Sequence, residues 1–441
     1  MSTQPARGTR DFLPGDIRRR EYVVRIVRDV YERYGFEPLE TPAFENIETL
    51  LGKYGEEGNK LIFKILRRGE HEGTGVADLA LRYDLTVPLA RVVAQYQNEL
   101  PKFFKRYQIQ PVWRADRPAR GRFREFYQCD IDSIGSTSPS VEAEQIVAVC
   151  EVLAELGFAD FVVRVNHRTV LTALLTNAGI QPEQQADALV ALDKLDKIGI
   201  DGIDKELAER GIPDLARHAL AGWIKAEYPP DWLDWLRRQF TLLDAEGEAA
   251  FGNLREILSL TAQNPAADKV RFEPSLARGL SYYTGAIMEV AVQGIGSLGG
   301  GGRYDKLIGM FLGRDIPACG FSLGLERIIV VMTERNMFPD SVAHGAVDVM
   351  VTMWNEETRA DSLALAAELR RSGLRVDVYP EVDKLGKQFK YAASRRIPFV
   401  AVAGDDERVR GEVALKDLRT GNQQSVPRPD AAVFVKSILH G

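Results

Sequence analysis

The sequence has few of the residues from which disulfide frameworks and metal sites are built. Its 441 residues include 3 cysteines and 5 histidines. Cys129, Cys150 and Cys319 show no paired spacing and no CxxC motif, so neither a disulfide framework nor a zinc site is indicated. Isolated thiols of this kind are typical of proteins in a reducing cytoplasm.

Long apolar segments are missing as well. No run reaches the roughly 20 apolar residues that cross a bilayer. Residues 1–16, MSTQPARGTRDFLPGD, contain no apolar signal core. We therefore expect a cytoplasmic protein with no membrane partner.

The chain also lacks an excess of positive charge. Its formal net charge is −6, with 27% charged and 45% hydrophobic residues. This acidic net charge argues against non-specific binding of nucleic acid, although an acidic protein can still have a local basic face. The length and composition predict two or three globular domains with full cores.

The most informative stretch lies between residues 107 and 132. Two runs rich in aromatic and β-branched residues, 107–113 and 123–131, are separated by a basic loop with Pro118 and Gly121, which predicts two antiparallel strands. Side chains on a strand alternate between its faces. One face of the second strand would therefore carry Arg122, Arg124, Phe126, Gln128, Asp130 and Asp132.

The order of these side chains favours a ligand site. The solvated outer face of a sheet would also be polar. Here the arginines lie toward the loop, Phe126 lies in the middle, and an amide and two carboxylates follow. Arginine binds phosphate through two parallel hydrogen bonds, and an aromatic ring stacks on a base. The row is thus suited to an aminoacyl-adenylate.

Residues 114–132, RADRPARGRFREFYQCDID, resemble motif 2 of the class II aminoacyl-tRNA synthetases, and REFYQCDID is similar to the histidyl-tRNA synthetase form. The segment FEPLETPAFE (36–45) resembles motif 1, the dimer-forming element of that class. Further segments that resemble the histidyl family are LRYDLTVPLAR (81–91), ARGLSYYTGAIMEV (277–290) and SLGGGGRYDKL (297–307).

The segment at 81–91 has two interpretations. Its residues predict a strand that runs into a helix capped by Asp84 or Thr86, with Pro88 in the first turn. The resemblance implies that Asp84 and Thr86, on one face of a strand, contact the substrate histidine. In the segment at 277–290, Ser281 replaces the aspartate that is usual in the family, while the arginine and the tyrosines are present.

Two later segments also leave alternatives. The glycines of 297–307 alone indicate a flexible turn, whereas beside the other motifs they predict a wall that lets backbone approach the bound amino acid. Residues 318–331, ACGFSLGLERIIVV, predict a strand that becomes a helix at Gly324. Arg327 then lies in the first helical turn, which favours anions. It either pairs with Glu326 or another acid or, as the resemblance to motif 3 implies, contacts ATP.

The expected fold class is α+β. The resemblance implies a catalytic domain with an antiparallel sheet over residues 1–340, with a helical insertion at about 170–265. Residues 345–441 alternate strands and helices and resemble an anticodon-binding α/β domain. A basic helix face there is either solvated or suited to RNA; it contains Lys384, Lys387, Tyr391 and Arg395.

The implied activity is that of a histidine–tRNA ligase. It would activate L-histidine with ATP, accompanied by Mg²⁺, and transfer histidine to tRNA(His), as a homodimer. Arg114 and Arg278 would be catalytic, and no side chain is assigned as a metal ligand. The implied histidine-binding residues are Asp84, Leu85, Thr86, Arg114, Gln128, Asp132, Arg278, Tyr282, Tyr283 and Tyr304. The implied ATP-binding residues are Arg114, Asp116, Arg122, Phe126 and Arg327.

Two other functions are compatible with parts of the sequence. A histidine-binding regulatory subunit of ATP phosphoribosyltransferase would tolerate Ser281, but it requires neither the two ATP-contacting arginines, Arg114 and Arg327, nor a C-terminal domain. A synthetase-like protein that only binds RNA is disfavoured by the same two arginines.

Overall fold

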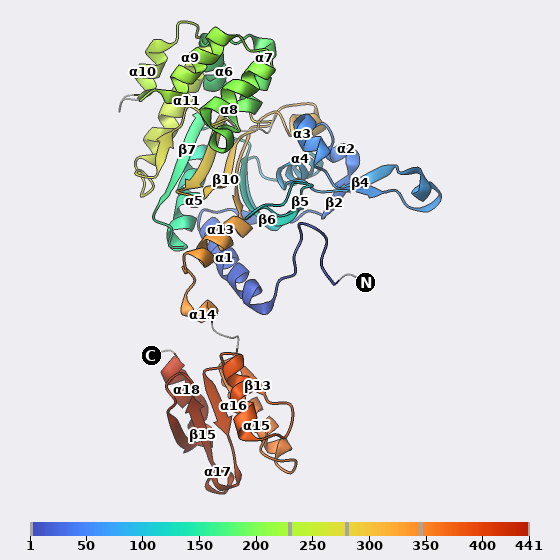
Figure 1. Cartoon of the computed structure of the whole chain (residues 1–441), viewed down its shortest axis with the longest axis vertical. Helices are drawn as coiled ribbons and strands as arrows, with labels where there is room; N and C mark the ends of the chain where they lie inside the picture. The colour runs from blue at the N-terminus through green and yellow to red at the C-terminus, as the bar shows by residue number, and fades with distance from the viewer. Residues whose placement is uncertain (1–2, 228–231, 278–281, 344–346, 440–441) are drawn as a thin grey trace. The chain divides into compact units, whose positions relative to one another are not determined.

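The structure is a computed structural model that describes residues 3–227, 232–277, 282–343 and 347–439 (Figure 1). It divides into two compact units. The large unit comprises residues 1–12 and 20–337, and the small unit comprises residues 13–19 and 338–441. Each unit has its own sheet.

The large unit is built on an eight-stranded sheet with the order β1-β5-β6-β11-β10-β9-β7-β8. All neighbouring strands are antiparallel except β1 with β5 and β7 with β8. The antiparallel sheet expected for the catalytic domain is therefore confirmed. The strands are β1 (Glu37–Pro38), β5 (Phe104–Trp113), β6 (Glu125–Ile134), β7 (Phe161–His167), β8 (Val270–Phe272), β9 (Ala286–Val292), β10 (Gly296–Arg303) and β11 (Ala318–Gly324).

The strand pair predicted around the basic loop is β5 and β6. The two strands pair antiparallel from Phe104 opposite Ile134 to Trp113 opposite Glu125. The loop turns at Gly121, whose φ of 67° suits glycine. From Gln128 to Ile134 every residue of β6 is buried. The polar face of this strand is therefore enclosed, and the solvated alternative is wrong.

Helices cover the opposite, apolar face of the sheet. They are α1 (Pro14–Arg33), α5 (Ser140–Glu155) and α13 (Leu325–Glu334). The Tyr31 hydroxyl donates to the Cys129 carbonyl at 3.2 Å, and Gln145 Nε2 donates to the Cys319 carbonyl at 2.8 Å. All three cysteines are buried and free.

The glycine run forms a strand, β10, so the flexible turn is wrong. That this strand forms a wall of the amino-acid site stays a prediction. A Cβ on Gly299 would lie 2.2 Å from the Ser322 carbonyl oxygen, and one on Gly301 would lie 2.0 Å from the Gly320 carbonyl oxygen. Both contacts are far inside van der Waals distance. Glycine is needed here because β10 runs unusually close to β11.

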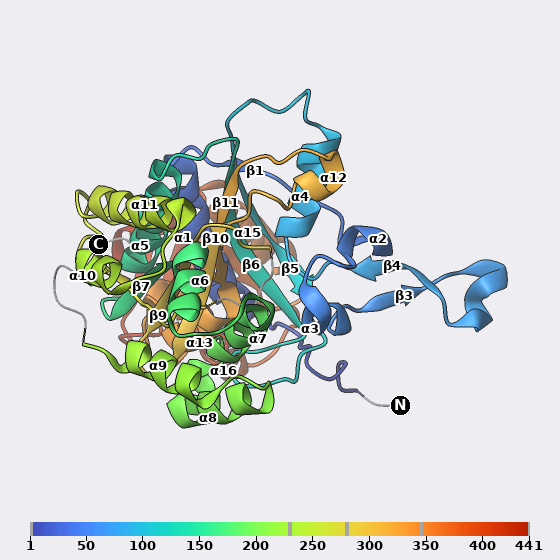
Figure 2. The ribbon, with the colours of Figure 1, turned by 90° about the horizontal axis from the view of Figure 1, so that it is seen from above.

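A small sheet, ordered β2-β4-β3, lies beside the large one. In Figures 1 and 2 the β3–β4 hairpin extends away from the other elements of the large unit. The strands are β2 (Phe44–Asn46), β3 (Lys64–Leu66) and β4 (Ala77–Leu81). The associated helices are α2 (Ile47–Leu50), α3 (Gly55–Lys60), η1 (Gly69–Thr74), α4 (Thr86–Gln95) and α12 (Gly309–Leu312).

The start of α4 corrects one prediction. Thr86 is the first residue of the helix, and Asp84 precedes it, so the two do not share a strand face. Asp84 Oδ1 accepts from the backbone N–H of Val87 at 3.0 Å. Residues 84–86 turn because that carboxylate satisfies a free amide of the first helical turn, which is the capping alternative.

Helices gather at one end of the large unit, between β7 and β8 in the chain (Figure 1). They are α6 (Arg168–Asn177), α7 (Pro182–Leu192), α8 (Leu195–Glu209), α9 (Asp214–Lys225), α10 (Trp232–Gln239) and α11 (Ala245–Thr261). His167 caps α6, because its Nδ1 accepts from the Thr169 amide at 3.1 Å. His218 is exposed on α9.

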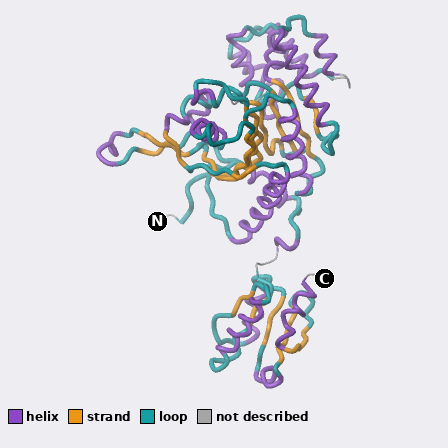
Figure 3. The backbone as a smooth tube through the Cα atoms, turned by 180° about the vertical axis from the view of Figure 1, so that it is seen from behind, coloured by secondary structure: helices purple, strands orange, loops and turns teal. Residues whose placement is uncertain are grey.

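The small unit has a five-stranded sheet with the order β13-β12-β14-β15-β16, and strands and helices alternate along it (Figure 3). The expected α/β character is confirmed. Strand β16 and helix α17 were not predicted. Its strands are β12 (Val349–Val351), β13 (Val376–Val378), β14 (Phe399–Val402), β15 (Glu412–Asp417) and β16 (Gln423–Pro427). Its helices are α14 (Asp340–Ala343), α15 (Arg359–Arg371), α16 (Leu385–Ser394), α17 (Asp405–Arg410), η2 (Arg428–Asp430) and α18 (Ala431–Leu439).

Acid should destabilise the fold through His167. Burial, with a smaller contribution from Arg303, lowers the pKa of His167 from 6.5 to about 4. The unfolded chain takes up this proton as the pH falls below about 6.5, whereas the folded chain does not until about 4. Up to about 3 kcal/mol of stability is therefore lost across that window. The variant His167→Asn keeps a capping oxygen but has no imidazole to protonate. Its free energy of unfolding, measured in urea, should fall less between pH 7 and pH 5 than that of the wild type. Equal losses in both proteins would contradict this role.

Candidate functional site

One face of the large sheet carries a set of buried polar side chains. The strand register places Gln108, Asp130 and Ser322 side by side across β5, β6 and β11, and places Arg106 opposite Asp132. We call this set the polar face. It comprises Arg106, Gln108, Gln110, Gln128, Asp130, Asp132 and Ser322. The adjoining positions of β11 and β10 are glycines, namely Gly320, Gly324, Gly300 and Gly302.

A buried ion pair occupies one end of the polar face. Arg106 Nη2 lies 2.7 Å from Asp132 Oδ2, and the Arg106 side chain is fully buried. Arg106 also donates to the Leu85 carbonyl at 3.3 Å, and the Tyr304 hydroxyl donates to Asp132. Burial raises the pKa of Asp132, and Arg106 opposes that shift. Leu85 thus contributes its carbonyl to this network, and its side chain is in the core.

A second buried carboxylate, Asp84, lies among tyrosines. Its Oδ1 accepts from the Tyr54 hydroxyl at 3.0 Å, and its Oδ2 accepts from the Tyr282 hydroxyl at 3.5 Å. Burial raises the pKa of Asp84. A carboxylate in this setting is a strong acceptor for an ammonium or imidazolium donor.

Aromatic rings connect Asp84 to Asp132. The ring centroids of Tyr282 and Tyr283 are 4.9 Å apart, and those of Tyr282 and Tyr304 are 6.0 Å apart. Because Tyr282 contacts Asp84 and Tyr304 contacts Asp132, the structure brings together predicted histidine-binding residues of four segments. Together these acidic and aromatic side chains can surround a small cationic ring.

Arg114 lies just beyond β5. Its Nε donates to the Tyr83 carbonyl at 3.0 Å. The guanidinium carbon lies 4.3 Å from the ring centroid of Tyr83 and 5.2 Å from that of Phe126. These contacts leave the two Nη groups of a half-buried cation available to a phosphate oxygen.

The remaining predicted ATP residues lie around the loop between β5 and β6. Arg122 is exposed and Asp116 is half-buried. Arg327 donates to the Ser297 carbonyl, and a Cβ on Gly121 of the loop would lie 3.5 Å from Arg327 Cγ. The suggested pairing of Arg327 with Glu326 is wrong, since Glu326 pairs with Arg20 at 3.3 Å and accepts from the Tyr127 amide at 2.9 Å.

Two residues named from the sequence are not described by the structure, and two residues of the site were not predicted from the sequence. Arg278 and Ser281 lie outside the described residues. Arg106 and Tyr54 were not predicted. Arg106 was detectable as the residue opposite Asp132 once the two strands were placed in register. Tyr54 belongs to a glycine-rich segment with no recognisable pattern.

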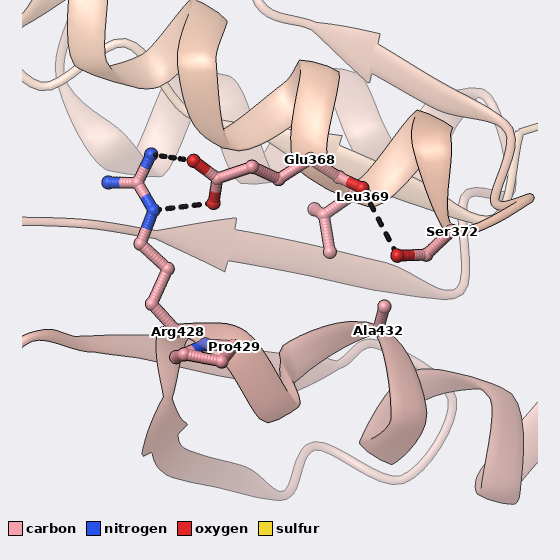
Figure 4. Close-up of a pocket in the computed structure, with 6 residues that line it drawn as sticks. All are labelled: Glu368, Leu369, Ser372, Arg428, Pro429 and Ala432. Atoms are coloured by element: carbon pink, nitrogen blue, oxygen red, sulfur yellow. Dashed lines mark hydrogen bonds and ion pairs between the residues drawn. The ribbon is translucent and has the colours of Figure 1, made fainter.

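A hollow lies in the small unit (Figure 4). It measures about 410 Å³ and contains none of the predicted site residues; its lining is Glu368, Leu369, Ser372, Arg428, Pro429 and Ala432. Arg428 is held by Glu368 at 2.7 and 2.9 Å and by Asp361 at 2.7 Å. Its charge is therefore already compensated, and the hollow offers no free cation to an anionic ligand.

The mostly antiparallel sheet carries arginines on the loop between β5 and β6 and at the start of α13, directly after β11. This arrangement is that of the class II aminoacyl-tRNA synthetases. A family model described as histidyl-tRNA synthetase matches residues 8–328, and one described as anticodon binding domain matches residues 348–438. The chain belongs to the histidyl-tRNA synthetase family.

Curated relatives match the chain over nearly its whole length. It is 41% identical to a histidine–tRNA ligase of Gloeobacter violaceus, covering 98% of each chain. It is 40% identical to one of Flavobacterium johnsoniae, covering 97% of this chain and 98% of the relative. The crystal structure of a Nostoc histidyl-tRNA synthetase superposes with a TM-score of 0.82 at 31% identity and covers 99% of this chain and all of that one.

A further solved structure shares the fold alone. It is described as an ATP phosphoribosyltransferase regulatory subunit/histidyl-tRNA synthetase from Bacillus halodurans, with a TM-score of 0.72 and 21% identity, and it covers 91% of this chain and all of that one. In the described part of the present chain, no helix is long and apolar enough to cross a membrane.

Arg303, which belongs to the GGRYD segment, should contribute to stability. Its Nε and Nη2 lie 2.6 and 2.8 Å from the carboxylate oxygens of the fully buried Glu142. Arg303→Met would leave that carboxylate uncompensated and should destabilise the protein by about 3–5 kcal/mol. In urea unfolding, the double variant with Glu142→Gln should regain part of the loss. A single variant within about 1 kcal/mol of the wild type would show that the pair contributes little.

Proposed function

We propose that the chain is a histidine–tRNA ligase that converts L-histidine and ATP to histidyl-adenylate and pyrophosphate, then transfers the histidyl group to tRNA(His) and releases AMP. The observation that carries this proposal is the distribution of charge along one sheet. Buried carboxylates and tyrosines lie at one end, and the arginines and Phe126 lie toward the loop. A bound histidyl-adenylate has its cationic and anionic groups in that order.

Histidine recognition relies on acceptors that are already enclosed. Asp84 and Asp132 are each 2% exposed, and each is oriented by a tyrosine hydroxyl. The α-ammonium and the imidazole N–H are both donors, so the two carboxylates together account for both ends of the amino acid. Leu85, Thr86, Arg114, Gln128, Arg278, Tyr282, Tyr283 and Tyr304 complete the proposed set.

Activation requires little covalent work from the protein. A carboxylate oxygen of histidine attacks the α-phosphorus of ATP, and pyrophosphate leaves. Arg114 and Arg278 neutralise the charge that grows on the phosphoryl oxygens, which is catalysis by positioning and electrostatics. Phe126 and Arg327 hold the adenine from its two faces. Removing one such cation costs on the order of 3 kcal/mol in the barrier.

Arg122 is proposed to bind the phosphates of ATP, and Asp116 is proposed to contact the Mg²⁺ that accompanies them. Mg²⁺ that accompanies ATP would neutralise part of the phosphate charge. The half-buried Asp116 supplies the kind of oxygen ligand that Mg²⁺ accepts alongside phosphates. Among the described residues, no group of three or more acidic, histidine or cysteine side chains is placed so that it could hold a metal ion.

The proposed partner of the small unit is the anticodon arm of tRNA(His). Much of the predicted basic face of α16 is already paired. Lys387 lies 3.0 Å from Asp383, and Arg395 pairs with Asp377. RNA phosphates must therefore compete with these acids, or bind Lys384 and stack on Tyr391. Homodimerisation is proposed through the edge that contains β1, and a cytoplasmic location follows from the tRNA substrate.

The regulatory subunit of ATP phosphoribosyltransferase is the less favoured alternative. Such a protein would bind histidine without activating it, and would have no use for Arg114 beside Phe126 or for Arg327 beside the loop. The proposed enzyme and the alternative differ in a single measurable reaction.

Histidine-dependent exchange between ATP and pyrophosphate tests the proposal. The purified chain should incorporate labelled pyrophosphate into ATP only when L-histidine is present, and should charge tRNA(His) when tRNA is added. Other amino acids serve as controls for specificity. Folded protein that binds histidine but gives no exchange would establish the regulatory alternative.

Arg114→Lys should lower the exchange rate by about a hundredfold, because lysine cannot reproduce the fork that binds two oxygens. Arg278→Ala should give a loss of the same order. Arg335→Lys is the matched control, since Arg335 is an exposed arginine paired with Asp160 at 2.7 Å. Thermal unfolding should be unchanged in all three variants. An Arg114→Lys enzyme within a few-fold of the wild type would exclude the catalytic role.

A further inference from the structure

Two arginines near the start of the chain, Arg10 and Arg20, have no role in the reaction as described above. The guanidinium carbon of Arg10 lies 3.9 Å from the ring centroid of Phe123 and 4.6 Å from that of Phe12. The guanidinium carbon of Arg20 lies 3.7 Å from the ring centroid of Phe12 and 4.4 Å from that of Tyr127. Rings and cations therefore alternate from Phe123 to Tyr127. We call these five residues, all of which belong to the large unit, the cation–aromatic stack.

One end of the stack is joined to the first turn of α13. Arg20 Nη2 lies 3.3 Å from Glu326 Oε1, and the side chains of this pair are 13% and 3% exposed. The Tyr127 backbone N–H donates to the other oxygen of Glu326 at 2.9 Å. Tyr127 directly follows Phe126 in the chain, and Glu326 directly precedes Arg327. This end of the stack therefore connects the two backbone segments that carry the proposed sides of the adenine site.

The other end of the stack lies at the loop between β5 and β6. Next to Phe123, the backbone N–H of Arg124 donates to the Gly8 carbonyl at 2.7 Å, and Arg124 Nε donates to the Asp116 carbonyl at 3.1 Å. A Cβ on Gly8 would lie 2.8 Å from Arg124 Cγ, and the φ of Gly8 is 87°. The N-terminal segment is thus attached to the end of the loop by a backbone hydrogen bond as well as by the stack.

A stack of this kind limits how far its members can separate. The attraction between a guanidinium and an aromatic ring acts at close range over the ring face, and a planar guanidinium fits between two rings. An adenine held from both faces requires its two neighbours at one separation. If the protein fixes that separation before ATP arrives, less of the binding free energy is lost in ordering the site.

We propose that Arg10 and Arg20 are positioning residues for ATP, which act through the cation–aromatic stack to hold Phe126 and Arg327 at the separation that accepts adenine. This inference rests on the proposed function, because it takes those two residues as the sides of the adenine site. None of the five residues of the stack belongs to the polar face, so the binding of L-histidine should not depend on them.

Arg10 is the residue to change, because removing Arg20 would also leave the buried Glu326 without its cation and destabilise the fold. Arg10→Met replaces the guanidinium with an uncharged chain. The KM for ATP in the exchange reaction should rise about three- to tenfold, the range expected for a lost cation–π contact. The KM for L-histidine should stay within about twofold of the wild type. Arg10→Lys keeps the charge but not the planar group, and its effect should be smaller.

A matched control is available at another cation–aromatic contact. Lys102 Nζ lies 5.0 Å from the ring centroid of the exposed Phe103. Lys102→Met removes this cation and should leave the KM for both substrates and the thermal unfolding of the protein unchanged. Calorimetric titration with ATP in the absence of histidine measures the affinity without the reaction, and Arg10→Met should weaken it by the same factor as it raises the KM for ATP.

The double variant of Arg10→Met with Phe123→Leu tests whether the two residues act through one contact. Phe123→Leu should raise the KM for ATP by itself, but the double variant should be no worse than the more severe single variant, because both changes remove the same contact. Additive rises in the KM for ATP would overturn the proposal.

Two other results would also overturn it. Equal rises in the KM for ATP and for L-histidine would show a general loosening of the fold. A KM for ATP within about twofold of the wild type in Arg10→Met would show that the stack only anchors the chain. If the wild type itself gave no histidine-dependent exchange, the proposed function would fail, whereas the calorimetric comparison of ATP affinity would still test the stack.

Discussion

The ion pair between Arg106 and Asp132 is the constraint on which the polar face depends. The structure encloses Asp84, Asp130 and Asp132 within one sheet face and its border, and carboxylates out of water are costly unless a cation compensates them. Arg106 is fully buried, lies 2.7 Å from Asp132, and lowers the pKa of both Asp130 and Asp132 against the effect of burial. Without it, one or more acids would be neutral and the face would lose the acceptors that a cationic amino acid requires.

The tyrosines extend this electrostatic arrangement without adding charge. Tyr54 and Tyr282 donate to Asp84, and Tyr304 donates to Asp132. Each hydroxyl stabilises an ionised acid while its ring excludes water. The arginines that are suited to ATP lie toward the loop end, beside Phe126 and Gly121. Arg106 is the cation that compensates the buried acids, whereas Arg122 and Arg327 lie toward the loop and pair with none of these three acids.

Local patterns in the sequence predicted the helices and strands. Which side chains meet in the site depends on pairings between residues far apart in the chain. The alternation from Arg122 to Asp132 was enough to place Gln128 and Asp132 on one face. It could not reveal Arg106, which lies on a separate strand, or the pairing of Arg303 with Glu142, 161 residues away in the chain. Thr86 was misplaced because capping competes with extended structure at a strand–helix junction. The family resemblance supplied the roles, which physical patterns alone left open.

The glycines of β10 restrict how this sheet can be remodelled. The backbones of β10 and β11 lie so close together that a side chain at Gly299 would collide with the Ser322 carbonyl oxygen. One at Gly301 would collide with the Gly320 carbonyl oxygen. Almost no residue other than glycine can therefore be accommodated at these positions. A substitution at either glycine should therefore separate β10 from β11 before it alters the preference for an amino acid, which depends on side chains of β5, β6 and the tyrosine segments.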